Sequence, residues 1–386
     1  MNFLDGYTVL DLASVGPAAR ASRLLADFGM RVIKVAPVAA KGAKQVDPVF
    51  HAYGAGRGTR RMRVDLKSDA GRDTLLQLAG HVDVVIESYR PGVAARLGVG
   101  YADFAAYNPK IVYCSTSGYG QHGPCAQWVG HDLNYLAMSG FLACSGRDAE
   151  GRPALPGATL ADGAGGGMHA AQSILAALLR RERTGKGASL DVAITDGALN
   201  LMSLYLDQYL ATGEDTGPGS GVLTGKYAWY GVYATGDGGH LAVGAIEGHF
   251  FRNLCRLLEL ESFADHQYDE TQQDAMRAAF AARFLTRSRD EWVALLAGAD
   301  TCVAPVLTVP EVVAHPQFRT RDAFMGAEHP GRGAFEQLAP VLAGCERRQP
   351  VHHVAPPGHT DTDAILAEAG FPASQIAELR TTGAIE

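Results

Sequence analysis

The chain has 386 residues, 47% of them hydrophobic and 19% charged, which is the composition of an ordinary soluble globular protein. A single compact core seldom grows to this length, so we expect two domains. The formal net charge of −7 argues against binding nucleic acid or an anionic membrane through bulk charge, although a local basic cluster could still hold a small anion.

The six cysteines show no spacing typical of a metal site, so we expect free thiols, mostly buried, and no bound metal. The first residues enter a strand pattern without the basic and apolar regions of a secretory signal. No apolar run is long enough to span a bilayer. The sequence therefore predicts a cytoplasmic protein without membrane contact.

The first part of the chain alternates short apolar runs with helical patterns. Residues 8–12 and 31–35 have the pattern of strands, and Gly16-Pro17 opens a helix between them. A helix over 68–78 and strands over 82–86 and 111–116 continue the alternation. Such β-α-β units predict a parallel, Rossmann-type open sheet. The first β-α turn lacks the glycine pattern G-x-G-x-x-G, which argues against a dinucleotide site.

The second part changes character after a strand over 188–194 and a helix over 196–210. A glycine-rich linker over 211–225 precedes two strand patterns that flank Gly236-Asp237-Gly238-Gly239, a hairpin signal. We therefore predict three parts. They are the N-terminal part of a large α/β domain (1–220), a small α+β domain (221–321) and a C-terminal segment that returns to the large domain (322–386).

The most informative stretch contains Gly130-His131-Asp132 and, further on, Asp162 followed by a glycine run and a helix over 168–183. Asp162 would lie beside the positive end of that helix, and the glycines would let a ligand approach the backbone. If His131 and Asp162 face one carbon atom, they could remove and return a proton. Equally, Asp162 and Asp132 could be helix caps, and His131 a buried structural histidine.

Several motifs together resemble the family III CoA-transferases (the CaiB/BaiF family), and most closely their α-methylacyl-CoA racemase branch. The motifs are Arg90-Pro91-Gly92-Val93, Arg96-Leu97-Gly98-Val99-Gly100, Gly118-Tyr119-Gly120-Gln121-His122-Gly123-Pro124, Arg183-Thr184-Gly185-Lys186-Gly187 and Cys302-Val303-Ala304-Pro305-Val306. The resemblance covers nearly the whole chain. It implies the family fold, a Rossmann-like large domain with a smaller α+β domain, and an interlocked homodimer.

The resemblance also implies an activity. In the racemases, residues matching His131 and Asp162 flank the carbon α to the thioester and exchange its proton through an enolate. Residues matching Glu247, and here Asp132, would support the imidazole. We therefore expect an acyl-CoA racemase or epimerase. The alternatives are a CoA-transferase, in which Asp162 forms an acyl anhydride, and a non-catalytic CoA-binding protein.

The CoA part of the substrate requires cations for its phosphates, whereas the proton transfer itself requires no further cofactor. Arg57, Arg60 and Arg61 form a basic cluster on a glycine-rich turn, and Arg96 lies in a family motif. We predict that Arg57, Arg61 and Arg96 bind CoA and that Tyr135 lines the pocket. Two residues, Thr224 and Tyr227, depart from the racemase pattern in a segment expected near the acyl pocket. The acyl group stays open, because branched fatty, steroid side-chain and aryl-propionyl thioesters all fit the same chemistry.

Overall fold

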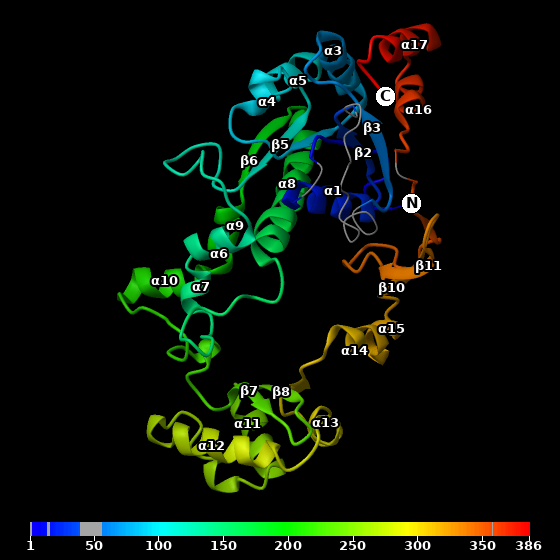
Figure 1. The fold of residues 1–386 in the computed structure, drawn as a ribbon. Coiled ribbons are helices and arrows are strands. Elements are labelled where there is room, and N and C mark those ends of the chain that lie inside the picture. Colours follow the sequence, from blue (N-terminus) through cyan, green and yellow to red (C-terminus); the bar gives the residue numbers. More distant parts are fainter. Residues whose placement is uncertain (1, 14–15, 39–55, 357) are drawn as a thin grey trace. The chain divides into compact units, whose positions relative to one another are not determined.

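The computed structural model describes residues 2–13, 16–38, 56–356 and 358–386 (Figure 1). The chain divides into two compact units. The large unit comprises Met1–Ser139, Pro156–Ser203 and Pro316–Glu386, and the small unit comprises Gly140–Leu155 and Leu204–His315. The small unit thus starts earlier than the predicted boundary at residue 221, and it also takes in an excursion from the first part of the chain.

The large unit is built on a six-stranded parallel sheet with the strand order β3-β2-β1-β4-β5-β6. Its strands are β1 (Thr8–Asp11), β2 (Arg31–Ala36), β3 (Thr59–Arg63), β4 (Val84–Glu87), β5 (Val112–Ser117) and β6 (Ala188–Ala193). The central strands β1 and β4 are buried at every residue and mostly apolar, because both faces of the sheet are covered. The parallel Rossmann-like sheet predicted from the sequence is confirmed.

Strand β3 corrects one detail of the prediction. Arg60 and Arg61 do not lie on a turn but in this edge strand, paired with Ile33 and Lys34 of β2. The segment reads Thr-Arg-Arg-Met-Arg, and only Met62 is apolar and fully buried. An edge strand needs little apolar surface, which is why composition alone resembled a basic turn.

Helices cover both faces of the sheet. The helical elements of the large unit are α1 (Gly16–Asp27), α3 (Asp69–Gln77), η1 (Leu78–His81), α4 (Val93–Arg96), α5 (Tyr101–Tyr107), α6 (Asp132–Met138), η2 (Ala161–Met168), α8 (His169–Thr184), α9 (Ile194–Leu201), α15 (Pro316–Thr320), α16 (Thr362–Glu368) and α17 (Ala373–Thr381). One core cluster packs Val9, Val32 and Val84 against α1 and α8. The other packs Leu10, Ile33 and Val85 against α3, α5, α16 and α17. Successive strand residues serve opposite clusters because side chains alternate along a strand.

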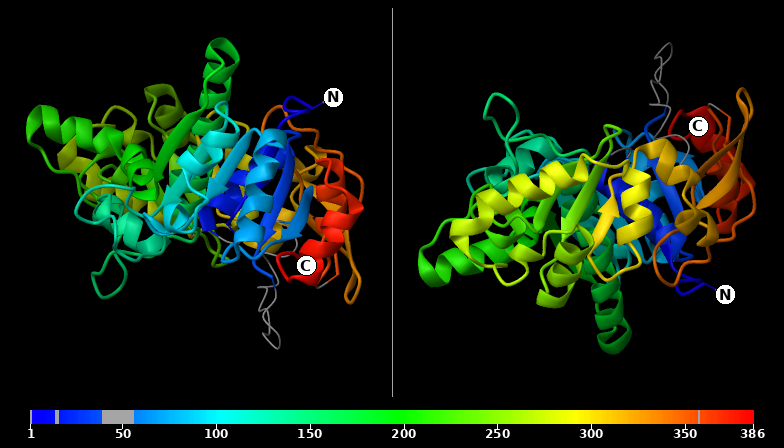
Figure 2. Two further views of the ribbon diagram at one scale, coloured as in Figure 1. Left: turned by 90° about the horizontal axis from the view of Figure 1, so that it is seen from above. Right: turned by 90° about the horizontal axis from the view of Figure 1, so that it is seen from below.

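The C-terminal segment closes the β3 edge of the sheet. Helix α16, red in Figures 1 and 2, packs beside β3. The backbone N–H of Arg61 donates to Asp361 at 2.9 Å, and the N–H of Asp361 donates to the Arg61 carbonyl at 2.7 Å. A bridge between Val64 and Ile385 continues the closure. The same part of the chain forms a separate small sheet of β10 (Phe324–His329), β11 (Gly333–Leu338) and β12 (His352–His353).

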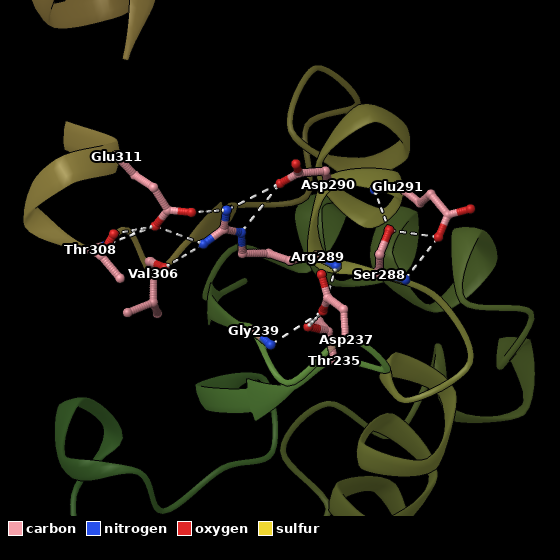
Figure 3. A network of polar contacts seen from close by, with 10 residues as sticks. All are labelled: Thr235, Asp237, Gly239, Ser288, Arg289, Asp290, Glu291, Val306, Thr308 and Glu311. Atoms are coloured by element: carbon pink, nitrogen blue, oxygen red, sulfur yellow. Dashed lines mark hydrogen bonds and ion pairs between the residues drawn. The ribbon is translucent and has the colours of Figure 1, made fainter. Parts of the chain in front are cut away.

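The small unit has an antiparallel sheet of β7 (Tyr230–Ala234), β8 (His240–Gly244) and β9 (Val303–Pro305), and the predicted β7–β8 hairpin is confirmed. Its helical elements are α7 (Phe141–Cys144), α10 (Ser203–Thr212, from Leu204 onward), η3 (Val222–Thr224), α11 (Gly248–Leu257), η4 (Glu261–Phe263), η5 (Glu270–Gln272), α12 (Gln273–Phe284), α13 (Arg289–Leu296) and α14 (Val309–Ala314). Figure 3 shows a polar network in this unit, in which Arg289 binds Glu311 and the Val306 carbonyl.

The two departures from the racemase pattern have structural roles in the small unit. Tyr227 is buried and stacks on Trp229, with ring centroids 4.9 Å apart and nearly parallel planes. Thr224 donates a hydrogen bond to the Gly217 carbonyl at 2.8 Å. The bulk of Tyr227 is therefore accommodated in a hydrophobic core.

Candidate active site

His131 stands at the N-terminus of α6, in the connection that follows the carboxyl end of β5. Its backbone N–H donates to the Asn134 side chain at 3.0 Å, which caps the helix and fixes the backbone at the histidine. The residue itself is exposed. This position corrects the alternative that His131 is a buried structural histidine.

Asp132 connects this helix to Asp162. Its Oδ1 accepts a hydrogen bond from the backbone N–H of Asp162 at 2.8 Å, across 30 residues of sequence. Asp132 therefore holds the backbone of Asp162 in place, a role that the sequence analysis did not predict. The prediction that Asp132 supports the imidazole of His131 stays untested.

Asp162 is half-buried in η2, an eight-residue π-helix that runs directly into α8. Burial raises the pKa of its carboxyl above the ordinary value, and the negative charge of Asp132 raises it further. The charges of Arg20 and His131 act in the opposite direction but do not cancel the rise. The large unit thus brings His131, Asp132, Asp162 and Arg20 into one electrostatic cluster.

The glycines after Asp162 have a different role from the one predicted. Gly165, Gly166 and Gly167 are buried, and η2 packs against both α1 and α9. A Cβ atom added at Gly166 would lie 2.5 Å from the Cβ of Pro17. The three glycines allow close packing between η2 and its neighbouring helices. They lie within the π-helix, whereas the sequence analysis expected a loop before the helix. π-Helical turns are often found at functional sites.

Two backbone N–H groups at the start of η2 are already in use. The Asp162 N–H donates to Asp132, and the Gly163 N–H donates to the Thr159 carbonyl at 3.0 Å. These two amides are therefore not free to donate to a negative charge beside Asp162.

Arg20 of α1 is the cluster residue that the sequence analysis missed. Its Nη2 donates to the Thr159 hydroxyl at 2.6 Å. A Cβ added at Gly163 would lie 3.3 Å from its Nη1, so the guanidinium lies against the residue next to Asp162. The available signal was its place on the first turns of the helix opened by Gly16-Pro17, since such a helix begins at the carboxyl edge of the sheet.

Tyr135 supports the loop that carries His131. The tyrosine is buried, and its hydroxyl donates to the Gly130 carbonyl at 2.6 Å. Its ring meets Tyr119 edge to face, with centroids 5.3 Å apart. Burial raises the pKa of the hydroxyl to about 12, so it stays protonated. The predicted contact between Tyr135 and the substrate remains untested.

The predicted CoA-binding arginines differ in what they contact. Arg57 is buried and makes a two-pronged ion pair with Asp27, at 2.7 and 2.8 Å from its Nη2, and it also donates to the Leu338 carbonyl. This is a structural role, and it corrects the expectation that Arg57 is presented to a ligand. Arg96 is the exposed last residue of α4, which follows the carboxyl end of β4. Among the described residues, it forms no ion pair.

Glu247 precedes α11 in the small unit, so its proposed contact with His131 remains a prediction. Within the described ranges 2–13, 16–38, 56–356 and 358–386, no cluster of His, Cys, Asp and Glu could hold a metal ion. No helix in those ranges is long and apolar enough to cross a membrane. The described cysteines are free.

Comparisons with known proteins agree with the fold and with these motifs. The chain is 35% identical to alpha-methylacyl-CoA racemase from Homo sapiens, over 99% of this chain and 97% of that protein. It is 29% identical to human succinyl-CoA:glutarate CoA-transferase, over 88% of this chain and 80% of that protein. A crystal structure of a CaiB/BaiF family protein from Brucella suis has a TM-score of 0.78 and 26% identity, covering 96% of this chain and 100% of that one. The sequence pattern of CoA-transferase family III matches residues 4–362, and the chain belongs to this family.

Proposed function

We propose that this chain is an acyl-CoA racemase that inverts the carbon α to the thioester of 2-methyl-branched acyl-CoAs. The main support for the proposal is the hydrogen bond from the Asp162 N–H to Asp132. It joins α6, which begins after His131, to η2, which contains Asp162. Two proton-carrying side chains are thereby held in one cluster. The 35% identity to a racemase over nearly the full chain supports the same activity.

The chemistry is a 1,1-proton transfer. One group removes the α-proton and leaves an enolate, and the other group delivers a proton to the opposite face. An imidazole can accept or donate a proton near neutral pH. The raised pKa of Asp162 brings its carboxyl closer to that range, so it can act as the acid in one direction and the base in the other. Each positioned acid or base typically contributes about 10²–10⁴-fold in rate.

The second candidate is a CoA-transferase, in which Asp162 attacks the thioester and carries the acyl group as an anhydride. This candidate is supported by CoA-transferases that are 29–31% identical to the chain. That reaction needs ionised Asp162 as a nucleophile and an acceptor carboxylic acid, and it does not need His131. The raised pKa of Asp162 weighs against it, because burial disfavours the ionised form.

An exchange experiment in D₂O distinguishes the racemase reaction from the transferase reaction. With a 2-methylacyl-CoA of one configuration, the wild type is expected to introduce deuterium at Cα with loss of configuration. His131→Ala and Asp162→Asn are each expected to abolish both the deuterium incorporation and the loss of configuration. The control is His81→Ala, which replaces an exposed histidine at the end of η1 and should behave as wild type. CoA transfer to a free acid that needs Asp162 but not His131, without exchange, would replace the racemase by the transferase.

The assembly of the protein rests on the family resemblance, and its location rests on the sequence analysis. We propose an interlocked homodimer that shares the site between chains, with Glu247 and Arg96 contributing as in the prediction. Analytical ultracentrifugation of active protein tests the dimer, and a stable, active monomer would contradict it. The cytoplasmic location stays a prediction that fractionation of cells can check.

A further inference from the structure

A cavity at the lateral edge of the parallel sheet gathers basic side chains that the proposed reaction does not use. It has a volume of about 150 Å³ and lies where β3, β12 and the segment before α16 meet. The residues that matter in its lining are Arg60, Arg61, His352, His353, His359 and Asp361. At about 30 Å³ per water molecule, the space is roughly that of five waters, which suits a small ion rather than an acyl chain.

Arg61 is the central cation of this cavity. Its backbone is fixed by two hydrogen bonds to Asp361, so the side chain starts from a defined position on β3. The residue is half-buried, and in the described part of the chain its guanidinium has neither an ion-pair nor a hydrogen-bond partner. A half-buried guanidinium without an acceptor has N–H donors available to a ligand.

The other charged groups around the cavity are either paired or basic. Arg60 binds Glu368 at 2.6 Å, and the pair His353–Glu328 is 3.3 Å apart. Asp361 is the one carboxylate in the lining, and it already accepts from the Arg61 N–H and lies 3.3 Å from His359. No carboxylate of the described lining is therefore bonded to the Arg61 guanidinium.

His352 also lies among basic side chains. Burial lowers its pKa, and the charges of Arg57, His353 and Arg61 lower it further. A bound anion would offset these positive charges and raise the pKa of His352, so anion binding and proton uptake would be linked.

The cavity is far from the candidate catalytic cluster within the sheet. Strand β3 is separated from β5, which leads to His131, by β2, β1 and β4. At about 4.8 Å between neighbouring strands, the two positions are roughly 19 Å apart along the sheet. An anion held here would not contact the carbon that exchanges its proton.

We propose that this cavity is a binding site for a phosphate group, with Arg61 as the principal ligand and His352 and His359 as further donors. A guanidinium fork matches two phosphate oxygens, and Arg61 offers such a fork with no acceptor bonded to it in the described part of the chain. The phosphate group could belong to free inorganic phosphate or to a phosphate monoester such as the 3′-phosphate of CoA.

The test is calorimetric titration of the full chain with inorganic phosphate at pH 6 and pH 8. Wild type is expected to bind at both pH values, because the guanidinium of Arg61 is charged at both. Arg61→Gln should weaken binding at least 10-fold, and Arg61→Lys should lose less because it keeps the charge. Lys110→Ala, an exposed cation elsewhere on the large unit, should bind as wild type.

The source of the phosphate group follows from competition. If CoA displaces phosphate and 3′-dephospho-CoA does not, the site holds the 3′-phosphate of the thioester substrate. If neither competes, it holds a separate phosphate ligand. Absence of phosphate binding by wild type, or equal binding by correctly folded Arg61→Gln and wild type, would overturn the proposal. The racemase proposal is tested separately, because α-proton exchange is measured without added phosphate.

Discussion

The packing of η2 against α9 makes Gly197→Ala a sharp test of how the site is held. A Cβ added at Gly197 would lie 2.5 Å from the carbonyl carbon and 2.6 Å from the Cα of Gly165, and closer still to its carbonyl oxygen. These are backbone atoms of η2, so no side chain can rotate away. Ordinary contacts begin at 3.4 Å, so α9 and η2 must separate by at least about 1 Å.

The magnitude follows from that separation. Overpacking a tight core costs about 1–3 kcal/mol, and contact between two backbones places this variant at the upper end. At about 2–4 °C per kcal/mol, the melting temperature should fall by roughly 6–12 °C. Because η2 also carries Asp162, a misplacement of about 1 Å should slow α-proton exchange by about 10²-fold.

The assay pairs thermal unfolding by circular dichroism with deuterium exchange at a temperature where the variant is folded. Gly80→Ala is the matched control: Gly80 lies in η1, its φ is not positive, and an added Cβ would meet no atom within 4 Å. We expect the control to be neutral or about 0.4–1 kcal/mol more stable. If Gly197→Ala melts and exchanges as wild type does, the close approach does not hold the site.

Three further changes test other parts of the structure. Asp27→Asn leaves the buried Arg57 charge without its partner and should lower the free energy of unfolding by about 3–5 kcal/mol in urea titration, whereas a loss below 1 kcal/mol would contradict the buried pair. Arg20→Gln removes a charge that lowers the pKa of Asp162, so the acid limb of the exchange rate in the direction that uses Asp162 as base should move to higher pH; an unchanged profile would remove Arg20 from the cluster. Glu311→Gln breaks the pair with Arg289, which lowers the Glu311 pKa from 4.5 to about 2. A depressed carboxyl pKa stabilises the fold above its unfolded value, so wild type should exceed the variant in melting temperature above pH 4.5, and the difference should vanish as the pH falls through about 2.

The architecture of the large unit could be predicted because its strands are marked in the sequence. Runs such as residues 84–86 are buried on both faces and therefore apolar, and Gly185 and the arginines before it end α8 as expected. The edge strand β3 has only one fully buried side chain, Met62, besides the partly covered arginines, so its composition gave no strand signal.

The candidate site was found in part, and the missing part depends on tertiary contacts. His131 and Asp162 stand in motifs that the family resemblance identifies, but the bond from the Asp162 N–H to Asp132 joins residues 30 positions apart. Arg20 reaches Thr159 across 139 positions. The glycine run suggested backbone open to a ligand, because glycine permits both exposure and tight packing, and only the neighbouring α1 and α9 decide between them.

The closure of the β3 edge by the C-terminal segment has a consequence for synthesis of the chain. Arg63 of β3 and its ion-pair partner Glu386 are 323 positions apart in the sequence. At about 5–20 residues per second, a ribosome needs roughly 16–65 s to make the stretch between them. During this interval β3 is a sheet edge with open hydrogen-bonding groups, available to another nascent chain. Chaperone binding to stalled nascent chains should therefore persist until the segment containing Asp361 has emerged.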